Sequence, residues 1–199
     1  MNRRLLLAAL FLSLFLVTAY ADGEGPVSWS ADCRLTWDLF RGTPPPDAAD
    51  LSEAAAIDMT IEWHVSYVLR PSTQPAGWIG SVQGVTVTNT MDPEGSWVLP
   101  GRESDRVLTH EQAHFDLNEV YRRKLVAGLA GITARGGTLD RTRSTLEEEI
   151  HRVADNILDR LSDMQERYDE KTKRGTDPEE QAAWEETIAE WLEDPAAAP

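Results

Sequence analysis

Alternating apolar and polar positions dominate the first half of this chain. From Ile57 to Leu69 the alternation is strict, which is typical of a strand with one buried face. A second alternating segment spans Val82–Thr90, and a turn then leads into Ser96–Leu99. We expect these segments to form a small antiparallel sheet. A shorter alternation over 35–39 predicts one more strand, which a following proline run ends.

Helical periodicity dominates the second half of the chain. Apolar residues at three- and four-residue steps predict one helix that includes Leu117–Leu129 and a second from about Thr142 to Tyr168. Asp177 and Pro178 signal the start of a third, shorter helix. Because the two long helices carry matching apolar faces, we expect them to pack as an antiparallel pair. The sequence therefore predicts an α+β fold in which a small antiparallel sheet precedes these helices.

The first residues have the three parts of a secretory signal peptide. Two arginines near the start precede an apolar block over 5–17, and Ala19-Tyr20-Ala21 supplies a small-x-small cleavage site. The block is too short for a permanent membrane span. We expect residues 1–21 to be removed, 22–194 to form a single domain, and the Ala- and Pro-rich residues 195–199 to be disordered. The protein is then exported, with no stable membrane insertion after cleavage.

Composition narrows the classes of partner. Without Arg3 and Arg4, the chain has 17 Lys and Arg against 34 Asp and Glu, a net charge near −17. This charge argues against nucleic acid and anionic membrane surfaces as partners. Cys33 is the single cysteine, so an intramolecular disulfide is excluded.

The sequence HEQAH at 110–114 carries the strongest chemical signal. On a helix, His110 and His114 lie one turn apart on the same face, where both imidazoles reach one metal ion. Glu111 is then placed to act as a general base on an activated water. Leu117 and Tyr121 continue the stripe of the histidines, so the stripe faces the core. These residues predict a zinc site with His110 and His114 as ligands.

A catalytic zinc ion usually takes three protein ligands. In an antiparallel helix pair, the residues opposite the histidines lie at about 157–170. Asp169 is the preferred third ligand because it stands at the predicted helix end, where the backbone can turn it inward. Asp159 and Asp163 remain alternatives. Glu148 lies farther along the helix axis and is a weaker one.

Three further residues or segments have candidate roles. Tyr168 could donate a hydrogen bond to a developing oxyanion, or it could simply end the apolar face of its helix. Asp116 could orient a ligand histidine, or it could have a surface or capping role. The segment 85–98 could act as an edge strand that holds a substrate in extended form, with an ordinary packed strand as the alternative.

Several separated motifs resemble one bacterial family, the domain-of-unknown-function family numbered 922. The motifs that carry this resemblance span nearly the whole chain after residue 21: LTWDLFRG at 35–42, SWV at 96–98, HEQAHFD at 110–116, YDEKT at 168–172, Gly175, Gln181 and Trp184. Members of this family are exported proteins regarded as zinc-dependent proteases with a zincin-like helix.

The resemblance implies specific roles for residues of this chain. It implies His110 and His114 as metal ligands, Glu111 as catalytic acid and base, and the pair Tyr168-Asp169 as part of the site. The chain departs from the family pattern before Gly175, where Arg174 stands at a position that is often histidine.

We therefore expect a secreted or periplasmic zinc metallopeptidase that uses Zn²⁺ and acts on a peptide or protein substrate of the cell envelope or exterior. A non-catalytic cell-envelope binding protein on a zincin-like scaffold is the main alternative. A zinc amidase for cell-wall peptide bonds is a third hypothesis. Glu111 discriminates between catalysis and binding, because hydrolysis needs its carboxylate whereas metal and partner binding do not.

Overall fold

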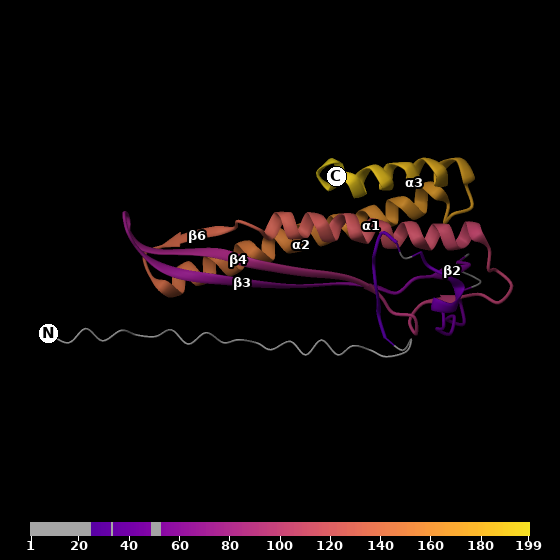
Figure 1. Ribbon diagram of the computed structural model, residues 1–199, viewed down its shortest axis with the longest axis horizontal. Coiled ribbons are helices and arrows are strands. Elements are labelled where there is room, and N and C mark those ends of the chain that lie inside the picture. The colour runs from indigo at the N-terminus through magenta and orange to yellow at the C-terminus, as the bar shows by residue number, and fades with distance from the viewer. Residues whose placement is uncertain (1–24, 33, 49–52) are drawn as a thin grey trace.

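The computed structural model describes residues 25–32, 34–48 and 53–199, which form antiparallel sheets and three α-helices (Figure 1). This is the α+β class that the sequence predicts. The predicted signal peptide and Cys33 lie outside the described residues. The elements are β1 (Val27–Ser28), a 3-10 helix (Trp37–Leu39), β2 (Ala55–Ala56), β3 (Met59–Thr73), β4 (Ala76–Met91), β5 (Trp97–Val98), α1 (Asp105–Leu129), β6 (Thr133–Gly136), α2 (Leu139–Thr172), α3 (Pro178–Glu193) and a second 3-10 helix (Pro195–Ala197).

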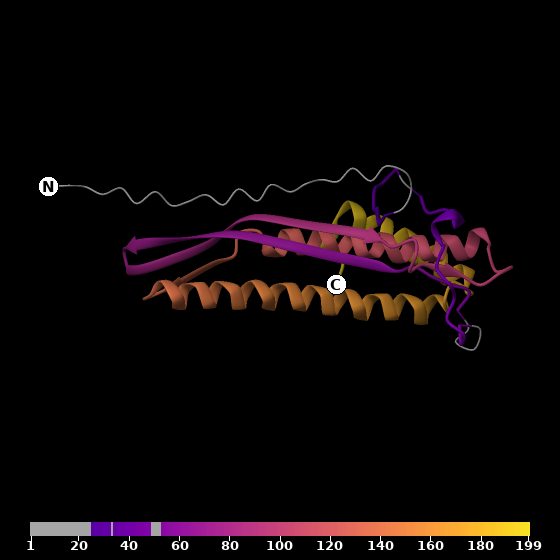
Figure 2. The same cartoon turned by 90° about the horizontal axis from the view of Figure 1, so that it is seen from below.

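A long hairpin of β3 and β4 forms most of the main sheet. Along β3 every second side chain from Met59 to Leu69 is partly buried, while the intervening ones are exposed, as the alternation predicts. β4 pairs with β3 along one side, and on its other side it pairs with β6 at 78–81 and with β1 at 90–91. Figures 1 and 2 show α1 and α2 running along this hairpin. The apolar side chains of the hairpin pack against buried residues of both helices, such as Leu125 of α1 and Leu146 of α2.

The two long helices form the predicted antiparallel pair. The predicted apolar positions of α1 are all fully buried: Leu117, Val120, Tyr121, Leu125 and Leu129. They meet buried positions of α2: Leu146, Ile150, Ala154, Leu161, Met164 and Tyr168. Each helix starts at a capping side chain, since Ser104 accepts a hydrogen bond from the Val107 amide and Thr138 accepts one from the Arg141 amide. No described helix combines the length and apolar character that a membrane span requires.

The third helix begins as predicted, but the tail after it is not disordered. Asp177 caps α3 by accepting a hydrogen bond from the Glu180 amide. The last residues form a 3-10 turn against α1, where Ala198 is 5% exposed and the Tyr121 hydroxyl donates to the Pro199 carbonyl. The ammonium group of Lys124 on α1 also donates to the Ala198 and Pro199 carbonyls. These contacts order a segment whose composition alone suggests disorder.

Two sequence expectations about strands are wrong. Residues 37–39 form a 3-10 helix because the chain turns there, with the Phe40 amide donating to the Trp37 carbonyl. The strand expected within Ser96–Leu99 is β5, which pairs with β2 in a separate two-stranded sheet. Within the segment 85–98, residues up to Met91 belong to β4, where 90–91 pair with β1 and, in the described part of the chain, 85–88 pair only with β3; a substrate-holding role for this segment stays a prediction. β6, which follows α1, was not predicted at all.

The core between the hairpin and α2 gives a test of this packing. Leu146 is fully buried, and its Cδ2 would lie 3.0 Å from a Cβ placed on Gly80 of β4. We expect Leu146→Ala to lower the free energy of unfolding by about 2 to 5 kcal/mol, because it leaves a cavity. The exposed neighbour Glu148 is the matched control, and Glu148→Ala should change stability by no more than about 0.5 kcal/mol. Urea unfolding followed by tryptophan fluorescence measures both, and equal losses would contradict the assigned core.

Candidate metal centre

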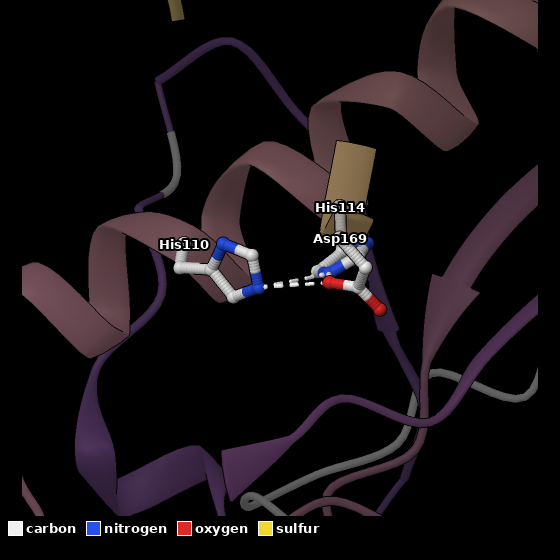
Figure 3. A group of neighbouring side chains, drawn as sticks. All are labelled: His110, His114 and Asp169. Atoms are coloured by element: carbon white, nitrogen blue, oxygen red, sulfur yellow. Dashed lines mark hydrogen bonds and ion pairs between the residues drawn. The ribbon is translucent and has the colours of Figure 1, made fainter. Parts of the chain in front are cut away.

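Three side chains from α1 and α2 converge at one point. His110 and His114 lie one turn apart on α1, and Asp169 lies near the end of α2 (Figure 3). The two Nε2 atoms are 3.2 Å apart, and they lie 3.1 and 3.0 Å from Oδ1 of Asp169. The three ligand atoms thus form a nearly equilateral triangle. Both imidazoles are largely buried, while the Asp169 side chain is about one third exposed.

This triangle has the dimensions of one face of a zinc coordination sphere. Bonds of about 2.0 to 2.2 Å in tetrahedral geometry place neighbouring ligand atoms about 3.3 Å apart. Two imidazole nitrogens and one carboxylate oxygen also match the donor types that zinc prefers. The cluster of His110, His114 and Asp169 could therefore bind a metal ion with little rearrangement.

Two glutamines behind the histidines fix which nitrogen faces the centre. Nδ1 of His110 lies 3.1 Å from Oε1 of Gln181, and Nδ1 of His114 lies 2.6 Å from Oε1 of Gln165. The amide nitrogens of both glutamines are committed elsewhere, Gln165 to the Asn118 side chain and Gln181 to Glu185. Since an amide oxygen only accepts, each Nδ1 carries the proton and donates it. In the neutral rings both Nε2 lone pairs therefore face the centre.

Three acceptor atoms that face one another need a cation or a shared proton between them. Burial alone would lower the pKa of His114, but the hydrogen bond with Asp169 and the nearby Glu111 carboxylate outweigh it and raise that pKa. Burial alone would raise the pKa of Asp169, yet its hydrogen bonds with both histidines hold that pKa far below the usual range. Without metal, a proton on His114 stabilises the cluster. A metal ion would bind in competition with that proton.

Glu111 lies on the pocket side of the same helix turn. It is 4% exposed, and its Oε2 accepts a hydrogen bond from the Ile57 amide at 3.1 Å. Burial raises the pKa of the Glu111 carboxyl, and the two histidines oppose this rise only in part. A raised pKa is the property that a general base needs near neutral pH.

One pocket of about 190 Å³ contains this group of side chains. The segment 53–57 forms one wall, and Asp169 of α2 and Arg174 just after this helix also line the pocket. The residues that line the pocket are Glu53, Ala54, Ala55, Ala56, Ile57, Met59, Val107, His110, Glu111, His114, Asp169 and Arg174. The predicted ligands and the predicted base therefore share one concave site.

Tyr168 lies behind the histidines and does not line this pocket. It is fully buried, and its ring stacks on His110 with 4.8 Å between centroids. Its hydroxyl bonds to the side chain of Gln181, and burial strongly raises its pKa. This position favours the interpretation that Tyr168 packs and supports the ligand histidine. An oxyanion role for Tyr168 stays a prediction.

The other sequence candidates lie away from the centre. Asp159, Asp163 and Glu148 are on the exposed face of α2. Asp116 bonds to the indole of Trp29 at 2.7 Å and to the side chain of Gln112, so it anchors the N-terminal segment rather than orienting a histidine.

Sequence reasoning assigned no role to two kinds of supporting residue, although Gly175 and Gln181 are among the residues that carry the family resemblance. No role was assigned to Gln165 or Gln181, although Gln165 lies four residues before Asp169 on the same helix face, a spacing that could have identified it. Gly175 is the other, because the backbone there has a φ of 71° and a Cβ would lie 2.9 Å from Cγ of His110. The backbone at Gly175 thus packs directly against a ligand ring.

We expect Gly175→Ala to weaken zinc binding at least about tenfold, because the new methyl group must displace the His110 ring or the loop. Mutation of residues that support metal ligands typically lowers metal affinity by about 10- to 100-fold. Gly131→Ala is the matched control. Its φ is 81°, so it has similar backbone strain, but a Cβ there meets nothing within 4 Å. Competition with a chromogenic chelator measures both affinities. Equal effects of the two variants would show that strain, and not contact with His110, matters.

Comparison with known proteins gives one match. A family profile described as "bacterial protein of unknown function (DUF922)" matches residues 45–175. The matched region contains β2 to α2 and with them His110, Glu111, His114 and Asp169. No match was found among curated proteins or among solved structures. Because the profile covers well over half of the chain, this protein belongs to the DUF922 family.

Proposed function

We propose that this protein is a zinc-dependent metallopeptidase that is secreted or periplasmic. One observation carries the proposal: three lone-pair donors form a triangle of zinc dimensions beside a buried carboxyl group in the same pocket. The signal-like residues 1–21 support the location outside the cytoplasm.

His110, His114 and Asp169 would hold the zinc ion. Zinc in such a site supplies Lewis-acid chemistry, activating a water and polarising a carbonyl group. Glu111 would accept a proton from the attacking water and return it to the leaving amine. The Ile57 amide keeps one oxygen of that carboxylate in place.

The short strand β2 supports an extended peptide as the substrate. Ala56 pairs with Trp97, and the Leu99 amide donates to the Ala54 carbonyl, so the backbone groups of 54 and 56 point toward β5. Because alternate residues of a strand point their backbone groups to opposite sides, those of Ala55 point away from β5. The Ile57 amide points the same way and meets Glu111. Among the described residues no strand pairs with this side of β2, so it can pair with an extended substrate next to the base.

Metal content is the first test. We expect purified protein to carry or take up about one zinc ion per chain, and His114→Ala and Asp169→Ala to lose it because each removes one of three ligands. Asp159→Ala, an exposed acid on the same helix, should keep it. Zinc affinity should fall as the pH is lowered through the raised pKa of His114, because the ring must lose its proton to bind metal. Plasma mass spectrometry and chelator competition measure these values. Wild-type protein that binds no zinc would contradict the proposal.

Hydrolysis is the second test. We expect Glu111→Gln to lower peptide cleavage by about 10² to 10⁴-fold while zinc content stays unchanged, because only the proton acceptor is lost. Digestion of a complex peptide mixture, followed by mass spectrometry, measures cleavage without a known substrate. Asp163→Asn, which removes an exposed charge on α2, serves as the control and should cleave normally. If zinc-loaded wild type and Glu111→Gln behave alike, the protein is not a peptidase of this kind.

A further inference from the structure

The chain leaves α2 through an unusual turn that ends in the pocket. Lys173 and Arg174 have φ values of 51° and 54°, and Gly175 follows with 71°. The Arg174 amide donates to the Asp169 carbonyl at 2.8 Å, so Arg174 is tied to the backbone of a candidate ligand. Left-handed backbone is unfavourable for a residue with a Cβ. An arginine at this position therefore points to a use for its side chain.

Charge in the pocket is unevenly distributed. Among the described lining residues, Glu53, Glu111 and Asp169 have carboxyl groups, and Arg174 alone has a fixed positive charge. Its guanidinium forms an ion pair with Glu53, which joins the wall at 53–57 to the end of α2. Lys173, the neighbour with the same backbone conformation, instead pairs with Asp177 and does not line this pocket. The turn thus directs only one of its two cations to the site.

We propose that Arg174 recognises a carboxylate of the substrate, and that Glu53 occupies its guanidinium when no substrate is bound. This inference rests on the peptidase function proposed above. A guanidinium binds a carboxylate through two parallel hydrogen bonds, and it cannot lose its charge near neutral pH. The Arg174 side chain is 45% exposed, so a ligand can reach it.

Replacement of the Glu53 carboxylate by a substrate carboxylate at Arg174 requires little free energy. An ion pair at this degree of exposure is weak, because water screens it. A substrate carboxylate can therefore replace Glu53 without loss of hydrogen bonds to the guanidinium. Once released, Glu53 no longer links the two sides of the pocket. The ligand is an α-carboxylate at a peptide C-terminus or the side chain of an acidic residue, which share this chemistry.

Small acids test the proposal without any need for hydrolysis. The probes are N-acetylphenylalanine, its amide, and the α-amide of N-acetylglutamic acid, each titrated into the isolated protein up to 50 mM. Nuclear magnetic resonance of the arginine Nε–H groups reports binding. We expect one of the two acids to bind at least about tenfold more tightly than the neutral amide. The acid that binds identifies the source of the carboxylate.

Four variants separate recognition from structure. Arg174→Gln should remove the preference for the acid, Arg174→Lys should keep part of it, and Glu53→Gln should strengthen acid binding about threefold or more by removing the internal competitor. Lys173→Gln is the matched control for charge and backbone, and it should behave as wild type. The proposal is overturned if neither acid gives a saturable shift, or if the preference survives Arg174→Gln.

Failure of the proposed role of Arg174 can be distinguished from failure of the peptidase proposal. A protein that binds zinc and cleaves peptides but shows no acid preference contradicts only the role of Arg174. A protein with an Arg174-dependent acid preference but no zinc contradicts only the peptidase. Any carboxylate that binds the metal itself would still bind to the Arg174→Gln variant. Comparison of wild type with this variant therefore isolates the contribution of the guanidinium.

Discussion

The convergence of three lone pairs on one point is the constraint that the rest of the site depends on. Two imidazole nitrogens and a carboxylate oxygen stand 3.0 to 3.2 Å apart, a separation that is repulsive unless a cation or proton lies between them. The glutamines behind His110 and His114 enforce this arrangement, because their amide oxygens require the ring protons on Nδ1. A buried cluster of this kind is unfavourable as mere packing. A proton shared with Asp169 relieves this repulsion, and a bound metal ion would do the same.

Tight helix packing supplies the rigidity that such a cluster requires. The buried stripes of α1 and α2 fix both the rotation and the relative height of the helices, so a ligand on one helix faces its partners on the other. Tyr168 links this core to the site, since its ring stacks on His110 while its hydroxyl bonds to Gln181. A tilt of either helix would therefore move a ligand. The same packing buries Glu111 and raises its pKa.

The end of α2 concentrates several functions within a few residues. Asp169 lies in the last turn, the Arg174 amide bonds back to its carbonyl, and Gly175 packs against His110. The residue at which α2 ends therefore sets where Arg174 and Gly175 lie relative to the pocket and to His110. The backbone strain at Lys173 and Arg174 is compensated by the hydrogen bonds of their amides to carbonyls of the last turn of α2.

The sequence by itself determined those features that depend on local spacing. Two histidines four residues apart on an apolar stripe face the same way in any helix, so His110, His114 and Glu111 could be predicted from the motif. The geometry of an antiparallel pair narrowed the third ligand to about 157–170, where Asp169 was preferred over Asp159 and Asp163 because of its place at the predicted helix end.

Only the tertiary structure decided which distant segments meet these residues. Gln165 and Gln181 approach the histidines from two other helices. β2 and Arg174 line the same pocket, although more than a hundred residues separate them. The strand expected at 35–39 fails for the same reason, since alternation creates a strand only where another strand is available to pair with it. Hydrogen bonds and packing between remote segments leave no periodic trace in a sequence, so these features appear only once the chain has folded.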